Sequence, residues 1–108
     1  MLILKPLHHP ATSTLQLPTV LYALSDSIRL SIVSSLSDRE ELACGNLSVP
    51  VGKSTVSHHV KTLREAGVVH VRTEGTHRFI SLRREDLETR FPGLLAAVLR
   101  GYEPEKRA

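Results

Sequence analysis

Apolar residues recur at helical spacing along the first half of the chain and predict three short helices. The first covers residues 18–24, with Pro18 in its opening turn and an apolar face made by Val20, Leu21 and Leu24. The third covers residues 39–47 and turns inward Leu42, Ala43 and Leu47. Residues 1–17 hold two prolines and a cluster of Ser and Thr, so they predict an irregular N-terminal arm. Its adjacent histidines, at positions 8 and 9, are expected to be disordered and have no assigned function.

The second helix of this series has a capping signal. Ser25 and Asp26 are both suitable N-cap residues, and the apolar spacing continues to about Leu36. The inward positions are expected to be Ile28, Ile32, Val33 and Leu36. On this pattern Arg29 and Ser31 face water.

Residues 53–66 predict a helix whose two faces differ in polarity. One narrow apolar face, at i, i+4 and i+7, is formed by Val56, Val60 and Leu63. The polar positions hold Ser, Thr, His, Lys and Arg, and Glu65 is their only acid. Gly67 suits the left-handed residue that ends a helix, and the proline-containing residues 48–52 predict a turn before it.

A β-hairpin is expected directly after this helix. Residues 68–73 are rich in β-branched side chains, residues 74–76 predict a turn, and residues 77–82 predict the returning strand. Helix, turn, helix and hairpin in this order are typical of a winged helix-turn-helix. The predicted fold class is therefore mainly α with a small β-hairpin.

The C-terminal quarter is more apolar than a small domain needs to cover its own helices. It predicts one helical turn over residues 86–90, a helix over residues 92–100 and a flexible tail over residues 101–108. We expect the first and last helices to join two copies into a homodimer. The expected interface comprises Leu21, Leu24, Leu94, Leu95, Val98 and Leu99. The folded unit is expected to span residues 18–100.

The positive charge of the chain is concentrated in one segment. Residues 48–84 hold seven Lys or Arg against two Asp or Glu, and four of the six histidines. Residues 1–47 hold three basic against four acidic residues, and residues 85–108 hold four against five. A local basic patch is typical of nucleic-acid binding, although a solvated surface gives the same count.

Composition narrows the class of protein and its compartment. Cys44 is the only cysteine, which excludes a disulfide scaffold and fits a reducing cytoplasm. Neither a signal peptide nor a run of about 18 apolar residues is present, so we expect a cytoplasmic protein without membrane contact. Two Phe, two Tyr and no Trp argue against base stacking, and favour duplex DNA over single strands.

The start of the helix over residues 53–66 carries the chemistry expected of a DNA recognition helix. Its Ser and Thr residues also suit any helix start, but Lys53 opposes the helix dipole and calls for an external anion such as phosphate. His58 is expected to contact bases, whereas His59 is equally compatible with a packed imidazole. The expected DNA-binding residues are Lys53, Ser54, Thr55, Ser57, His58, Lys61, Arg64, Arg72, His77 and Arg78. Of these, Lys61, Arg64 and Arg72 are assigned to phosphates, and His77 and Arg78 to the wing.

Three stretches of the chain resemble a known family. Residues 23–30 resemble its "ALSDPTRL" sequence, residues 54–69 resemble its "STVSHHLKVLREAGLV" helix, and Glu74 and Gly75 fall at its wing turn. The chain is thus similar, over about residues 18–100, to the ArsR/SmtB family of bacterial winged helix-turn-helix repressors. The resemblance implies a homodimer that binds an imperfect inverted repeat at a promoter and is released by an effector.

The metal-sensing sites of this family are not matched. Its metalloid type carries Cys-Val-Cys before the turn, and the matching positions are Ala43, Cys44 and Gly45, with one thiol where soft metals need two or three. Its zinc type needs histidine in the last helix, and no histidine follows His77. We therefore expect no metal and no cofactor. The effector and the operator sequence are not predicted.

Other functions remain as alternatives. Cys44 is either a small packed residue or the thiol of a redox-responsive repressor. A winged-helix protein interaction module without DNA binding is a second alternative, although it has no use for the concentrated positive charge. An enzyme is not expected, since Gly52-Lys53-Ser54 lacks the upstream glycine of a phosphate-binding loop.

Overall fold

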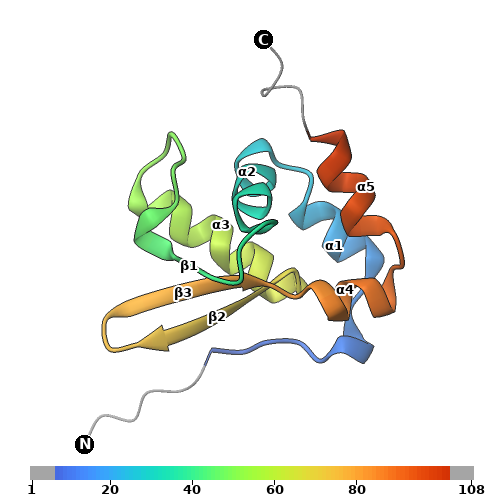
Figure 1. Ribbon diagram of the computed structural model, residues 1–108. Coiled ribbons are helices and arrows are strands. Elements are labelled where there is room, and N and C mark those ends of the chain that lie inside the picture. Colours follow the sequence, from blue (N-terminus) through green and yellow to red (C-terminus); the bar gives the residue numbers. More distant parts are fainter. Residues whose placement is uncertain (1–6, 103–108) are drawn as a thin grey trace, which may run out of the picture.

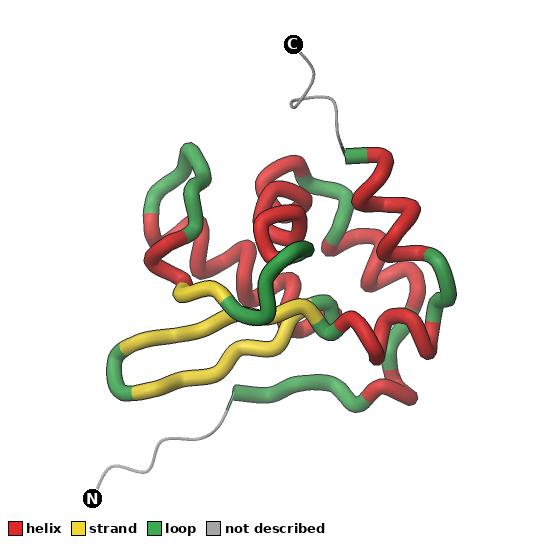
Figure 2. The backbone as a smooth tube through the Cα atoms, viewed as in Figure 1, coloured by secondary structure: helices red, strands yellow, loops and turns green. Residues whose placement is uncertain are grey.

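Five α-helices and a small sheet form the protein, whose computed structural model describes residues 7–102 (Figures 1 and 2). The helices are α1 (Leu17–Ala23), α2 (Ser27–Leu36), α3 (Lys53–Ala66), α4 (Arg84–Arg90) and α5 (Leu94–Gly101). Two 3₁₀ turns accompany them, η1 (Thr12–Thr14) and η2 (Cys44–Asn46). The first six residues of the predicted arm and residues 103–108 of the predicted tail lie outside the described residues. Over residues 7–102, no helix is long and apolar enough to cross a membrane.

Capping residues fix the ends of the two helices that matter most for the site. Asp26 Oδ2 accepts hydrogen bonds from the backbone N–H groups of Ile28 (2.9 Å) and Arg29 (3.1 Å), which begins α2. The bond from the Arg29 N–H, above all, lowers the pKa of Asp26. Gly67 ends α3 with a φ of 90°, in the left-handed region that favours glycine. Both predicted boundaries are confirmed.

The sheet has three antiparallel strands in the order β1-β3-β2. Strands β2 (Val69–Glu74) and β3 (His77–Leu82) form the predicted hairpin, with Val71 opposite Ile80. The short strand β1 (Leu42–Ala43) pairs with the other edge of β3. In Figure 1 the hairpin projects from one end of the molecule, and α4 and α5 lie at the other. The wing expected from the sequence is therefore present, with one additional strand.

The predicted helix over residues 39–47 is wrong. Leu42 and Ala43 lie in β1, and the chain then makes only the 3₁₀ turn η2. Gly45 and Asn46 disfavour a helix, and pairing with β3 satisfies backbone groups that a helix would otherwise use. The guanidinium of Arg84 holds the preceding loop by donating to the carbonyl oxygens of Leu36, Ser37 and Arg39, each at 2.7 Å.

The hydrophobic core lies between the helices and the sheet, and the N-terminal arm contributes to it. Its fully buried members include Leu15, Val20, Ile32, Val33, Leu36, Leu63, Val68, Val69 and Ile80. Leu15 lies directly against Gly67, where an added Cβ would come within 2.1 Å of Leu15 Cδ2. Gly67 is thus required both for its backbone angle and for the close approach of the arm.

The described part of the arm packs along the wing, so the expectation of a disordered histidine pair is wrong. The backbone N–H of Val71 donates to His9 Nε2 at 3.0 Å, and the His9 and His70 rings stack 4.2 Å apart. Farther along, Thr12 donates to Asp86 Oδ1 at 2.6 Å, a bond that, more than any other contact, lowers the pKa of Asp86. These contacts exist because β2 is an edge strand whose outer N–H groups need partners.

The His9 contact predicts that the arm is held less firmly in acid. Burial, followed by the neighbouring His70, lowers the pKa of His9, so the unfolded chain binds a proton at higher pH than the folded chain. The stabilisation is complete above the ordinary histidine pKa of about 6.5 and is lost as the pH falls through the lowered folded value. His9→Gln, which keeps an acceptor but cannot titrate, should lose less unfolding free energy than the wild type between pH 7.5 and pH 5.

Urea denaturation over that pH range measures the difference, with His8→Gln as the matched control. The His8 ring is exposed and only its backbone carbonyl is used, accepting from Arg64 Nη1 at 2.6 Å. The control should therefore follow the wild type. Parallel curves for His9→Gln and the wild type would show that the His9 contact does not hold the arm.

Candidate nucleic-acid interface

Helix α3 presents the predicted recognition residues on its outer face. Val60, Leu63 and Ala66 are buried, and they anchor the inner face on the core. The exposed positions are Lys53, Ser54, Thr55, Ser57, His58 and Lys61. The hydroxyls and the imidazole are hydrogen-bonding groups suited to base edges, and the two lysines supply positive charge for phosphate.

A cleft of about 390 Å³ brings most of these residues together with the wing. Helix α3 supplies Ser54, Ser57, His58, Lys61 and Arg64, and β3 adds Arg78 from the facing side. The floor is apolar and includes Val60 and Val71. Residues far apart in the sequence thus surround one concave, basic surface. Lys53, Thr55 and His77 are exposed but do not line this cleft.

Two of the predicted phosphate contacts already have partners within the protein. Arg72 donates to both carboxylate oxygens of Glu41, at 2.8 and 3.0 Å, and to Glu74 at 2.7 Å. It also lies over the Phe79 ring, 4.4 Å from its centroid. These carboxylates raise the pKa of Arg72, and Arg72 in turn lowers the pKa of Glu41. Arg64 is held by the arm through the carbonyl oxygen of His8.

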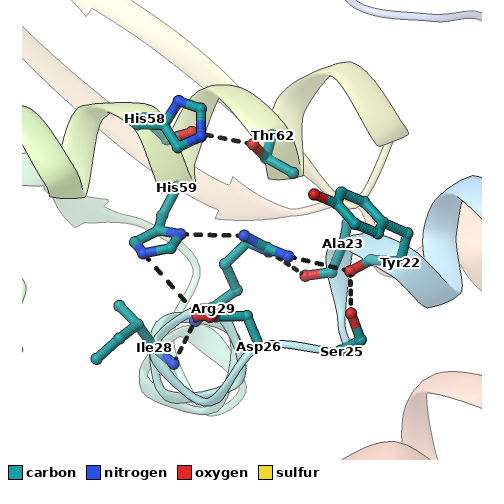
Figure 3. A network of polar contacts seen from close by, with 9 residues as sticks. All are labelled: Tyr22, Ala23, Ser25, Asp26, Ile28, Arg29, His58, His59 and Thr62. Carbon is teal, nitrogen blue, oxygen red and sulfur yellow. Dashed lines mark hydrogen bonds and ion pairs between the residues drawn. The ribbon is translucent and has the colours of Figure 1, made fainter.

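The sequence pattern missed a buried polar cluster behind α3, shown in Figure 3. Arg29 was expected to face water, but only 6% of it is exposed. Its Nη1 lies 3.1 Å from His59 Nδ1, and the His59 side chain is 13% exposed. His59 is therefore the packed imidazole of the two alternatives. The signal was available, because Arg29 stands at i−3, i−4 and i−7 from the buried residues Ile32, Val33 and Leu36.

Cys44 lines the same cleft as the recognition residues. Burial raises the pKa of its thiol, an effect only partly offset by the positive charge of Arg78. A raised pKa leaves less of the reactive thiolate at neutral pH. The redox-responsive alternative thus stays a prediction that these surroundings do not favour. Within residues 7–102, no group of three or more His, Cys, Asp or Glu side chains is arranged to hold a metal ion.

The residues assigned to the dimer interface divide into two groups. Leu24 is 6% exposed and belongs to the core of the single chain, so it offers almost no surface to a partner. Leu21 is 45% exposed, alongside Leu17 and Tyr22 on the same short helix. Four further residues of the predicted interface are half-buried on α5, namely Leu94, Leu95, Val98 and Leu99. Helices α1 and α5 lie at the end of the molecule away from the wing tip (Figure 1).

A basic, exposed helix seated beside a β-hairpin defines the class of protein, a winged helix-turn-helix DNA-binding protein. The model of a helix-turn-helix domain family matches residues 24–72. An uncharacterized HTH-type transcriptional regulator from Bacillus subtilis, YceK, is 39% identical over 79 residues, which cover 70% of this chain and 79% of that protein. The arsenical resistance operon repressor of Staphylococcus aureus is 36% identical over 74 residues, 68% of this chain and 71% of that protein. The chain belongs to the ArsR/SmtB family and is a DNA-binding transcriptional regulator.

Solved structures agree with this assignment. HlyU from Vibrio cholerae has a TM-score of 0.65 at 30% identity, covering 79% of this chain and 89% of that one. BigR from Xylella fastidiosa, described as a transcriptional repressor, has a TM-score of 0.64 at 25% identity, covering 84% and 86% respectively. The predicted fold class and the predicted family are both confirmed.

Proposed function

We propose that the protein is a cytoplasmic transcriptional repressor that binds, as a homodimer, an inverted-repeat operator in duplex DNA. The observation that carries this proposal is the cleft in which the hydroxyls and imidazole of α3 face the same space as Lys61, Arg64 and Arg78. The names of two similar proteins, an arsenical resistance operon repressor and the repressor BigR, support repression as the outcome of binding.

The residues of the interface have separate roles in this proposal. The first turns of α3 enter the major groove and read base edges through Lys53, Ser54, Thr55, Ser57 and His58. Lys61 and Arg64 bind phosphates on either side, and the wing adds His77 and Arg78 at the flanking backbone or minor groove. Arg72 reaches a phosphate only by leaving Glu74, so it contributes least.

Two recognition helices in a twofold dimer address half-sites about one helical turn apart, roughly 34 Å along the DNA. The proposed dimer surface joins the exposed residues of α1 to the half-buried apolar residues of α5. Covering them removes Leu17, Leu21 and Tyr22 from water, each of which is at least 42% exposed in the single chain. Neither helix leads into the cleft, so the DNA face stays open when the surface is covered.

Leu95→Asp is expected to convert the dimer into a monomer, because it places a charge in the apolar surface that two copies share. Operator affinity should fall at least about tenfold, since one half-site then binds without the other. Sedimentation equilibrium measures the mass, and a binding titration measures the affinity. Ala97→Asp carries the same charge on the exposed, opposite side of α5 and should remain dimeric. An unchanged mass for Leu95→Asp would remove α5 from the interface.

A further inference from the structure

The charge of Arg29 is buried within α2 and is neutralised by the end of another helix. Its Nε donates to the carbonyl oxygen of Ala23 at 2.6 Å, and its Nη2 donates to that of Tyr22 at 3.1 Å. These are the last two residues of α1, where carbonyl oxygens lack partners within the helix and the helix dipole is negative. Arg29 therefore fixes the end of α1 against α2.

The third arm of the guanidinium extends to the recognition helix. Arg29 Nη1 lies 3.1 Å from His59 Nδ1, and because guanidinium nitrogens only donate, Nδ1 must be the acceptor. The imidazole then carries its proton on Nε2, which lies 3.9 Å from Asp26 Oδ2. Asp26 is the same residue that caps α2. One cluster thus joins the end of α1, the start of α2 and the middle of α3 (Figure 3).

His59 occupies a position on α3 from which it controls the direction of the recognition residues. It follows Ser57 and His58 directly, but its side chain points inward where theirs are exposed. The other inward contacts of α3 are apolar, through Val60 and Leu63, and such contacts are non-directional. The bond between Arg29 and His59 is directional, and it sets the rotation of α3 about its own axis.

We propose that Arg29 and His59 are positioning residues, which hold the base-reading face of α3 at a fixed rotation relative to the dimer helix α1 without contacting DNA themselves. This inference rests on the proposed function, because it needs α3 to be the helix that reads bases. Hydrogen bonds to base edges weaken steeply with misalignment, whereas the attraction between cations and phosphates depends little on orientation. Loss of the junction should therefore reduce operator binding and leave binding to random DNA unchanged.

A matched pair of substitutions at His59 tests the junction. His59→Asn places an oxygen acceptor close to the position of Nδ1, whereas His59→Leu has the same branched shape and no acceptor. Affinity is measured for an operator recovered by selection from random duplexes, and for a random duplex of the same length, over a range of salt concentrations. Urea denaturation of each variant shows that binding is measured on folded protein.

His59→Leu should lower the ratio of operator to random-duplex affinity about tenfold, with the same salt dependence as the wild type, and His59→Asn should keep the ratio within about twofold. A role in stability alone would move the urea midpoint and not this ratio. An unchanged ratio in His59→Leu overturns the proposal, and so does an equal loss in both variants. A wild-type protein that prefers no duplex would instead refute the proposed function, and the junction with it.

Discussion

A protein in which Ser57 and His58 are both replaced by alanine should bind its operator no better than a random duplex. Both side chains are exposed on α3 and line the cleft that faces the wing. Each contact between a side chain and a base edge contributes about 1–3 kcal/mol of discrimination, so losing two reduces the preference about 100-fold or more. Competition titrations with operator and random duplexes measure this preference.

Lys61→Ala is the matched control on the same helix. Lys61 is exposed and is assigned to phosphate, which carries no sequence information. The substitution should weaken binding to operator and random DNA by similar factors, and lower the slope of log affinity against log salt by about one for each site lost. If the Ser57 and His58 double variant keeps its preference for the operator, the base contacts are misplaced.

Gly67→Ala should destabilise the fold by about 3 kcal/mol. The residue has a φ of 90°, and the new Cβ would come within 2.1 Å of the buried Leu15 side chain. Backbone strain and overpacking therefore act together at one position. The free energy of unfolding from urea titration gives the value.

Gly75→Ala separates the two causes. Gly75 lies in the wing turn with a φ of 62°, and an added Cβ there meets nothing within 4 Å. This variant should lose only the conformational part, about 1 kcal/mol. Equal losses at the two glycines would mean that Leu15 does not pack against the end of α3.

The parts of the fold that the sequence predicts best are those specified by local rules. Helix α3 begins and ends where its apolar spacing and Gly67 place it, and Asp26 caps α2 as expected. The hairpin follows from β-branched residues on both sides of a turn that contains Gly75. In each case the relevant interactions lie within a few residues of one another.

The errors arise where long-range contacts override local spacing. Residues 39–47 have the apolar spacing of a helix, but the free edge of β3 recruits Leu42 and Ala43 as a third strand. Arg29 appears polar in the sequence, yet its partners are the carbonyl oxygens of α1 and a histidine 30 residues away. Such partners can be identified only once the helices are packed together.

The candidate site shows the same division. The row of polar residues on α3 is evident from the sequence, whereas its pairing with Arg78 across the cleft requires the fold. Conversely, local charge counts treat Arg72 as available, although Glu41, from a distant segment, binds it. Charge in the sequence therefore locates the surface, and the structure determines which cations are available for DNA.

The proposal that α3 enters the major groove is tested most directly by dimethyl sulfate protection of the operator. The reagent methylates guanine N7, an atom that lies in the major groove. The wild-type protein should protect guanines in two tracts about one helical turn apart, roughly 34 Å along the axis, and the Ser57 and His58 double variant should not. Full reactivity of these guanines in a duplex that the wild-type protein occupies would contradict major-groove recognition by α3.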